Sequence, residues 1–325
     1  MSKKRILSGI QPSGMLHIGN YFGAMKQYLE LQEENESFIF IANYHALTST
    51  KDSEALKQNT LEVALHYLAI GLDPEKTNLF IQSDVPEVCE LSWILSTITP
   101  MGLLERCHSY KDKIAKGLSP DHGLFAYPVL MASDILIYKS DIVPVGRDQK
   151  QHVEVARDVA IKFNNIYGEI LTIPDVRIKD DTAIVPGIDG QKMSKSYDNY
   201  ISLFEDEKTI KKQIMKIVTD STPLEEPKDP DKCNVYAIYK LFASNDEISE
   251  MRKKYLNGGF GYGDAKKELL GKMLDYFGPA RTKYQELKNN FDYVKDVLKK
   301  GAITAREIAV NTLNEVNEAV GIIKI

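Results

Sequence analysis

Short apolar runs alternate with longer amphipathic segments in the first part of the chain. Four runs rich in aliphatic, β-branched and aromatic side chains predict buried strands, at residues 5–9, 38–42, 79–82 and 142–145. Between these runs apolar side chains recur at helical spacing, as they do at Ile18, Phe22, Met25 and Leu29. Strands that alternate with helices favour a parallel sheet with helices on both faces, so the pattern predicts a Rossmann-like α/β domain.

The pattern changes after Ile201. Strand signals stop there, and helices are predicted at residues 207–218, 235–244, 246–255, 264–277, 280–300 and 304–320. The segment 220–232 is rich in Pro, Asp, Glu and Thr and predicts a loop. The sequence therefore divides into an α/β domain over residues 1–204, an α-helical domain over residues 205–302, and a C-terminal helix within residues 303–325.

The composition is typical of a soluble globular protein, with 43% hydrophobic and 27% charged residues in a chain of 325. No apolar run approaches a membrane span, and the N-terminal apolar stretch is too short for a signal-peptide core. Three cysteines stand far apart without a CxxC pair, which argues against a disulfide framework and against a zinc or iron–sulfur site. We therefore expect a cytoplasmic protein with no membrane partner.

The net charge is −5, from 41 Lys and Arg against 46 Asp and Glu. A chain of this charge has no overall positive field that would attract a nucleic acid. Charge alone gives no reason to propose such a partner, which would have to bind local basic patches.

The first candidate phosphate site follows the first predicted strand. A turn over residues 11–14 leads from the strand to a helix, and a helix start in this position points free N–H groups at an anion. His17 and Asn20 are three residues apart and share a face of the first turn. Gly19 between them has no side chain, so a ligand ring or a ribose could lie against the backbone.

The second candidate phosphate site is the loop 187–196. Gly187 and Gly190 favour a mobile loop, and Lys192 and Lys195 supply two positive charges beside serine hydroxyls. Such a group suits a polyphosphate whose negative charge grows as a bond breaks. A solvated basic turn is the alternative for this loop taken by itself.

Together the two sites resemble the paired signatures of class I aminoacyl-tRNA synthetases, which here read His17-Ile18-Gly19-Asn20 and Lys192-Met193-Ser194-Lys195-Ser196. The first has Asn in its last place, and the second matches in full. Three further stretches resemble the bacterial tryptophanyl-tRNA synthetases, at residues 9–14, 127–136 and 143–152. The resemblance covers essentially the whole chain. One partial departure is Asn43, where relatives often have Asp.

The resemblance implies a two-step reaction. Tryptophan would attack the α-phosphate of ATP to give tryptophanyl-adenylate and pyrophosphate, and the tryptophanyl group would then pass to tRNA(Trp), releasing AMP. Mg2+ would be carried on the nucleotide phosphates, without a metal cage built by the protein. The resemblance also implies a homodimer, a catalytic domain over 1–204, anticodon binding by 205–302, and a final helix that packs back on the catalytic domain.

The resemblance assigns catalysis to Lys192, Lys195 and His17, with the lysines stabilising the leaving pyrophosphate. The implied ATP contacts are Gln11, Pro12, Ser13, Gly19, Asn20, Gly146, Arg147, Asp148, Ile184, Lys192, Met193, Ser194, Lys195 and Ser196. Two simpler interpretations remain open: His17 could be a surface histidine, and Asp148 could cap the helix that follows it.

Asp134 is the predicted specificity residue. It lies in an apolar helical run, where an unpaired carboxylate would be costly, and indole offers one N–H donor. A carboxylate that accepts this N–H would favour tryptophan over phenylalanine, whereas the alternative is a structural Asp paired with Arg or Lys. Tyr127 and Gln149 are candidates for the ammonium or carboxylate of tryptophan. The predicted pocket walls are Met131, Val143 and Val145, which could equally be core residues.

Three other functions compete with this one. A tyrosyl-tRNA synthetase would need polar partners for a phenol, a smaller adenylate-forming enzyme would lack the helical region, and a non-catalytic paralogue would have lost phosphate contacts that are intact here. Lys111 and Lys113 could reach ATP or tRNA, although a solvated helix face is the simpler interpretation. Trp93 lies where the resemblance implies a dimer interface, and it could also be core.

Overall fold

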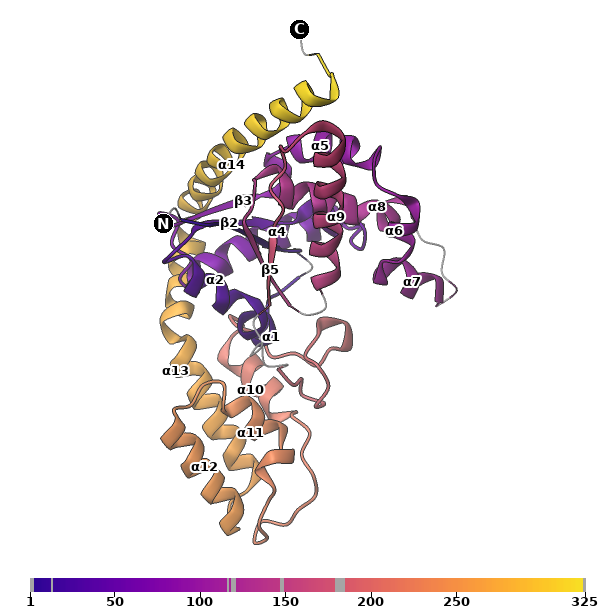
Figure 1. Ribbon diagram of the computed structural model, residues 1–325. Coiled ribbons are helices and arrows are strands. Elements are labelled where there is room, and N and C mark those ends of the chain that lie inside the picture. Colours follow the sequence, from indigo (N-terminus) through magenta and orange to yellow (C-terminus); the bar gives the residue numbers. More distant parts are fainter. Residues whose placement is uncertain are drawn as a thin grey trace.

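The computed structural model describes residues 3–12, 14–115, 117, 121–146, 149–178 and 185–323. In these residues five parallel strands form one sheet in the order β3-β2-β1-β4-β5 (Figure 1). The strands are β1 (Arg5–Ile10), β2 (Glu36–Ile41), β3 (Thr77–Ile81), β4 (Ile142–Val145) and β5 (Asp175–Ile178). The order reverses at β1, and ligands of such sheets bind at that point, beyond the carboxyl ends of the strands. The predicted α/β fold is therefore confirmed.

The fifth strand was not predicted. Its sequence, Asp-Val-Arg-Ile, alternates polar and apolar residues at one edge of the sheet, so it lacks the apolar run that marks the other four. Since an edge strand needs only one buried face, this short segment forms a strand through pairing with β4 and carries little signal of its own.

Nine α-helices belong to the described part of the α/β region: α1 (Ile18–Asn20), α2 (Lys26–Leu31), α3 (Asn43–Ala46), α4 (Ser53–Ala69), α5 (Glu87–Ser96), α6 (Met101–Glu105), α7 (His108–Ala115), α8 (His122–Ile137) and α9 (Lys150–Tyr167). The sheet separates two cores, as the side chains of β2 show. Phe38 and Phe40 pack with α5, α8 and α9, whereas Ile39 and Ile41 pack with α4. This alternation along a strand buries both faces of the sheet.

The helical region comprises α10 (Glu207–Met215), α11 (Asn234–Tyr239), α12 (Asn245–Asn257), α13 (Tyr262–Asn289) and α14 (Phe291–Val320). Figure 1 shows α10, α11 and α12 in a lobe beside the sheet domain, with α13 extending from the lobe to the sheet domain and α14 running along the sheet domain. The predicted helix end before Pro279 is wrong, because α13 continues through this proline. Buried Phe277, Tyr284 and Leu287 on either side hold the helix together across the missing hydrogen bond.

Helix α14 covers the outer strand β3. A side-chain carbon at Gly301 would lie 2.2 Å from the carbonyl oxygen of Leu79, so only glycine allows this close crossing. Arg306 also pairs with Glu87 at 2.8 Å, but exposed ion pairs of this kind contribute little stability. Residue 302, the predicted domain boundary, lies inside this continuous helix.

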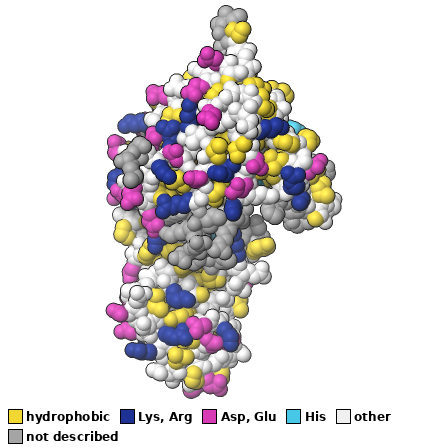
Figure 2. Space-filling view, in the orientation of Figure 1, with side chains coloured by type: hydrophobic (Ala, Val, Ile, Leu, Met, Phe, Trp, Pro, Cys, Tyr) yellow, Lys and Arg dark blue, Asp and Glu magenta, His cyan; other side chains and the backbone are white. Residues whose placement is uncertain are grey.

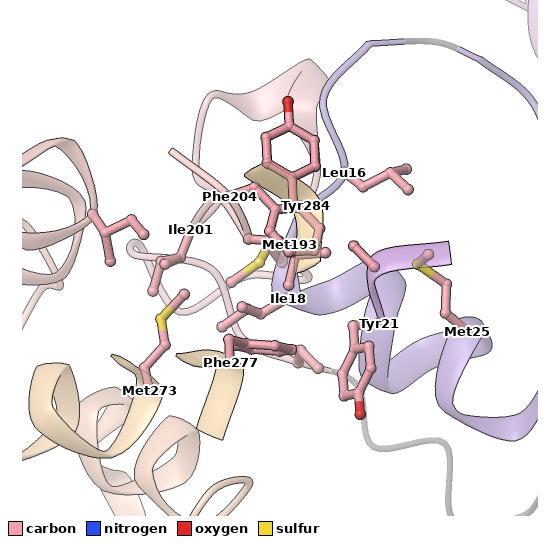
Figure 3. Close-up of a cluster of buried hydrophobic side chains, with 14 of the residues drawn as sticks. Leu16, Ile18, Tyr21, Met25, Met193, Ile201, Phe204, Met273, Phe277 and Tyr284 are labelled. Atoms are coloured by element: carbon pink, nitrogen blue, oxygen red, sulfur yellow. The ribbon is translucent and has the colours of Figure 1, made fainter. Parts of the chain in front are cut away.

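The helix after the first turn is interrupted by a π-helical turn, η1 (Tyr21–Met25), where one continuous helix over 18–34 was predicted. The turn directs Tyr21 and Phe22 towards α13, and Tyr21 contacts Phe277 edge to face with 5.0 Å between ring centroids. Figure 3 shows Ile18, Met193 and Phe277 in the same cluster. The two signature segments and α13 thus share one core.

The surface shows no dominant charge. On the face drawn in Figure 2, Lys and Arg side chains are interspersed with Asp and Glu, as the small net charge suggests. None of the helices in the described ranges is long and apolar enough to cross a bilayer.

Candidate active site

A cleft of about 800 Å³ lies at the carboxyl ends of β1 and β4. It brings together predicted residues that are far apart in the sequence, and side chains from both signatures and from α8 line it. Those predicted site residues are Gln11, His17, Gly19, Asn20, Tyr127, Met131, Asp134, Gly146, Gln149, Lys192, Met193, Ser194 and Lys195. Val143 and Val145 of β4 also line the cleft. A nucleotide-sized ligand would fit this space at the position where the order of the sheet reverses.

Some predicted residues do not line the cleft. Pro12 is buried in its turn, so only its neighbour Gln11 reaches the cleft. Lys111 is exposed on α7 and is likewise not a cleft residue. Other predicted residues lie outside the described part of the structure, namely Ser13, Arg147, Asp148, Ile184 and the side chains of Lys113 and Ser196.

Backbone hydrogen bonds join the two signatures. The N–H of Ile18 donates to the carbonyl of Ile201 at 3.0 Å, and the N–H of Leu203 donates to the carbonyl of Leu16 at 3.4 Å. Because residue 201 follows soon after the second signature, this short bridge brings both loops to one side of the cleft. Lys195 then reaches across, and its amine lies 3.4 Å from the point where Gly14 would carry a side-chain carbon.

Gly19 is constrained by close packing. A side-chain carbon at this position would lie 2.8 Å from His17 Nδ1 and 3.2 Å from the Cβ of Met193. The sequence suggested a glycine that leaves room for a ligand; the structure adds that the imidazole and the second signature occupy much of the space beside it. Asn20 holds the same turn from the other side, where its Oδ1 accepts the backbone N–H of His17 at 3.0 Å.

Burial lowers the pKa values of one side chain in each signature, Lys195 and His17. It lowers the pKa of the Lys195 amine to about 8. Burial, and then the positive charge of Lys195, lower the pKa of His17 to about 4. At neutral pH the imidazole is therefore uncharged, with one donor and one acceptor nitrogen, and Lys195 is positively charged. The cleft offers an anion a cation and a neutral hydrogen-bonding ring.

Nucleotide affinity should therefore fall as pH rises through about 8. Below that pH Lys195 carries the positive charge that binds an anion. Above it, the fraction of Lys195 that is protonated in the free protein falls about tenfold with each pH unit. Calorimetric titration with ATP between about pH 7 and about pH 9.5 should show this loss of affinity. The same titration of Lys195→Met should be weaker and nearly flat with pH, and an equally steep profile in the variant would contradict the assignment.

Asp134 lies at the other end of the cleft and is 1% exposed. His45 Nε2 lies 2.7 Å from its Oδ2, and Gln82 Nε2 lies 2.8 and 2.9 Å from its two oxygens. A carboxylate only accepts hydrogen bonds, so both nitrogens donate. Among the described residues a histidine and a glutamine hold this carboxylate and no Arg or Lys pairs with it, and two oxygens with four acceptor positions keep capacity for another donor.

The orientation of Gln82 is fixed from behind. Its Oε1 accepts the backbone N–H of Tyr44 at 3.0 Å, so its amide nitrogen must face Asp134. Asn43 ties the same two loops together, since its side chain bonds both the N–H and the hydroxyl of Ser83. Asn in place of the family's frequent Asp thus has a structural role here.

Tyr127 and Gln149 are joined by a histidine to which the sequence gave no role. His152 Nδ1 lies 2.9 Å from Gln149 Oε1, and its Nε2 bonds the hydroxyl of Tyr127. Since an amide oxygen only accepts, the histidine donates to Gln149 through Nδ1, and its Nε2 shares the other hydrogen bond with the tyrosine hydroxyl. Neither Tyr127 nor Gln149 is free to rotate, and both present fixed edges to the cleft.

Sequence reasoning gave His45 a possible place in the pocket lining, where the structure has it, but assigned no role in the site to Gln82 or His152. Gln82 follows directly after β3, so the rule that polar residues at the carboxyl ends of strands form sites would have found it. His152 gave no such signal, because an isolated histidine in a helix is usually a packed residue.

A parallel sheet in this order, with a cationic loop at its carboxyl edge and a buried acceptor deep in the cleft, defines a nucleotide-binding enzyme of the Rossmann type. The family of class I tRNA synthetases (W and Y) matches residues 2–277. The chain belongs to this family, and the predicted class is confirmed.

Proteins similar in sequence and in structure match nearly the whole chain. A tryptophan–tRNA ligase of Fusobacterium nucleatum is 60% identical over 321 residues, which cover 98% of either protein. The crystal structure of tryptophanyl-tRNA synthetase from Campylobacter jejuni, complexed with ADP and tryptophan, is 56% identical with a TM-score of 0.93, covering 98% of this chain and 99% of that one. The corresponding enzyme of Mycoplasma pneumoniae has 31% identity and a TM-score of 0.82 over 98% of either chain.

Proposed function

We propose that the cleft activates L-tryptophan with ATP and transfers it to tRNA(Trp), releasing pyrophosphate and AMP. The observation that carries the proposal is Asp134, a buried carboxylate in the same cleft as the two signature loops, whose hydrogen bonds with the described residues leave room for another donor. Tryptophan–tRNA ligases that are 60% and 55% identical over 98% of this chain support the choice of amino acid.

In this proposal the two ends of the cleft have separate tasks. Lys192 and Lys195 stabilise the charge that develops on pyrophosphate as it leaves, and His17 and Asn20 hold the phosphates and ribose. The carboxylate of tryptophan attacks the α-phosphate directly, so the protein supplies position and charge and no covalent intermediate. Gln11, Gly19 and Gly146 complete the nucleotide site, with Ser13, Arg147, Asp148 and Ile184 as further proposed contacts.

At the amino-acid end, Asp134 accepts the indole N–H, and Met131 and Val143 form apolar walls for the ring. Tyr127 and Gln149, fixed by His152, bind the ammonium or carboxylate group of the amino acid. A phenol would bring a hydroxyl in place of the indole N–H and a smaller ring, so a tyrosine-specific site would need other partners.

ATP enters this site as its magnesium complex, with the ion carried on the phosphates. Among the described residues no group of three metal-ligating side chains occurs, and the phosphates are themselves hard oxygen ligands of the kind Mg2+ prefers. The helical region 205–302 is proposed to bind the anticodon of tRNA. A cytoplasmic location accompanies this role and agrees with three free cysteines, Cys89, Cys107 and Cys233.

A homodimer is also part of the proposal. Two large apolar side chains on consecutive helices are exposed, Trp93 on α5 at 74% and Met101 at the start of α6 at 63%, and exposed apolar side chains of this size are candidates for an interaction surface. We expect Trp93→Asp to shift the protein from dimer to monomer, because it places a charge in that contact. Sedimentation equilibrium at several concentrations measures the mass, with the exposed Ile166→Asp as the control, and a dimer of unchanged stability would contradict this interface.

The decisive experiment is ATP–pyrophosphate exchange with single amino acids. Exchange should depend on tryptophan and fall by orders of magnitude with tyrosine, and [14C]tryptophan should be transferred to tRNA(Trp) transcripts. Exchange with tyrosine at the higher rate would instead establish a tyrosyl enzyme. No exchange with either, with ATP bound, would indicate a nucleotide-binding paralogue.

A further inference from the structure

One buried side chain organises the loop that carries the two lysines. Asn199 lies outside both signatures, is 2% exposed, and makes three hydrogen bonds. Its Nδ2 donates to Asp189 Oδ1 at 2.8 Å and to the carbonyl of Lys192 at 3.2 Å, and its Oδ1 accepts the backbone N–H of Ser194 at 2.7 Å. Both ends of its amide are therefore bonded within the loop.

The loop closes tightly around this amide. A side-chain carbon at Gly187 would lie 2.4 Å from Asn199 Nδ2, so the glycine provides the space in which the amide sits. The backbone of Asn199 takes part as well, because its carbonyl accepts the N–H of Ile188 at 2.9 Å. Glycine at this position thus serves packing as much as loop mobility.

Asp189 extends the same contact to the turn before the lysines. Its Oδ1 accepts both the amide of Asn199 and the backbone N–H of Gln191 at 3.0 Å, although the residue as a whole is exposed. Asn199 is therefore bonded directly to the backbone of Lys192 and Ser194, and through Asp189 to the backbone of Gln191. Since the Cα atoms of Lys192 and Lys195 follow this backbone, the place of both amines depends on it.

We propose that Asn199 is the positioning residue for Lys192 and Lys195, and that it acts through its hydrogen bonds with Asp189 and with the backbone of Lys192 and Ser194. The inference rests on the proposed role of the two lysines in activating tryptophan. An aspartate at 199 would keep the bond from Ser194, but its second oxygen would face two acceptors, Asp189 Oδ1 and the Lys192 carbonyl. The loop would then have to shift, and misplacing a catalytic group by about 1 Å can lower a rate about 100-fold.

The test exchanges the hydrogen-bond donor and acceptor between Asn199 and Asp189. Asn199→Asp should lower kcat of ATP–pyrophosphate exchange about 100-fold. Asp189→Asn should stay within about threefold, because an amide oxygen can still accept from Asn199. The double variant restores the donor–acceptor pair between positions 189 and 199, but the Lys192 carbonyl still faces an oxygen and the N–H of Gln191 faces the new amide, so the rate should rise about tenfold above that of Asn199→Asp without reaching that of the unmodified enzyme.

Two further measurements separate positioning from loss of structure. Calorimetric Kd for tryptophan should be unchanged in all variants, since Asp134 lies at the other end of the cleft, and thermal unfolding reports the fold. If Asn199→Asp fails to fold, Asp189→Ala takes its place, because residue 189 is exposed. Asp189→Ala removes the acceptor of the Asn199 amide and should lower kcat about tenfold, whereas kcat of Asp189→Asn should stay near that of the unmodified enzyme.

Equal activity of Asn199→Asp and the unmodified enzyme would overturn the inference, as would a folded double variant without recovery or an Asp189→Ala that matches Asp189→Asn. Failure of the proposed function has a different signature. In that case the unmodified enzyme would show no tryptophan-dependent exchange, or Lys195→Met would retain the full rate, whatever the Asn199 variants do.

Discussion

Replacing Lys195 by methionine should lower kcat of tryptophan-dependent ATP–pyrophosphate exchange by about 10²- to 10³-fold, the usual cost of removing one preorganised charge or donor from a developing anion. Methionine keeps most of the length and apolar volume of the lysine stem, so packing against Gly14 is largely retained and the charge is what is lost. The KM for tryptophan should change by less than about threefold, because the amino acid binds at the Asp134 end.

Lys57→Met is the matched control. Lys57 is exposed on α4 and pairs with Glu54 at 2.8 Å, far from the lining of the cleft, so the same substitution there should leave exchange unchanged. A parallel loss in both variants would indicate a general effect of charge or stability. An unchanged kcat in Lys195→Met would remove the cationic loop from the mechanism.

Most of the sheet could be predicted from the sequence, whereas the edge strand β5 and one helix end could not. Strands β1 to β4 were predictable, because each carries an apolar run, and the outer strand β3 is itself covered by α14. Strand β5 was not, since Asp175 and Arg177 face outward at the edge and its pairing with β4 supplies most of the structure. The helix end expected at Pro279 failed for a related reason, because tertiary packing outweighed a local preference.

The site divides in the same way. Short segments whose function depends on contiguous residues, such as the loop with Lys192 and Lys195, were evident in the sequence. Contacts between distant residues were not: no pattern in the sequence indicates that Gln82 and His45 both meet Asp134, from which they lie 52 and 89 positions away in the chain. A sequence shows which side chains can hydrogen-bond, and only the fold shows which of them meet.

Replacing Asp134 by asparagine should raise the KM for tryptophan and lower kcat/KM about 10- to 100-fold, while the KM for ATP stays within about twofold. A hydrogen bond to a charged group contributes about 1.5–3 kcal/mol, which corresponds to this range. The structure gives a second reason. His45 and Gln82 both donate to the carboxylate, so an asparagine offers one oxygen to three donors, and its own NH2 group faces a donor.

Specificity for the indole N–H can be measured directly with the tryptophan analogue in which sulfur replaces the ring nitrogen. The unmodified enzyme should prefer tryptophan, because the analogue leaves the buried carboxylate of Asp134 short of a donor. Asp134→Asn should lose most of that preference, whereas Asp121→Asn, exposed at the start of the same helix, should keep it. Because the variant and the analogue each remove one side of the same hydrogen bond, their effects on kcat/KM must be strongly non-additive. Additive effects would show that the indole nitrogen and Asp134 do not meet.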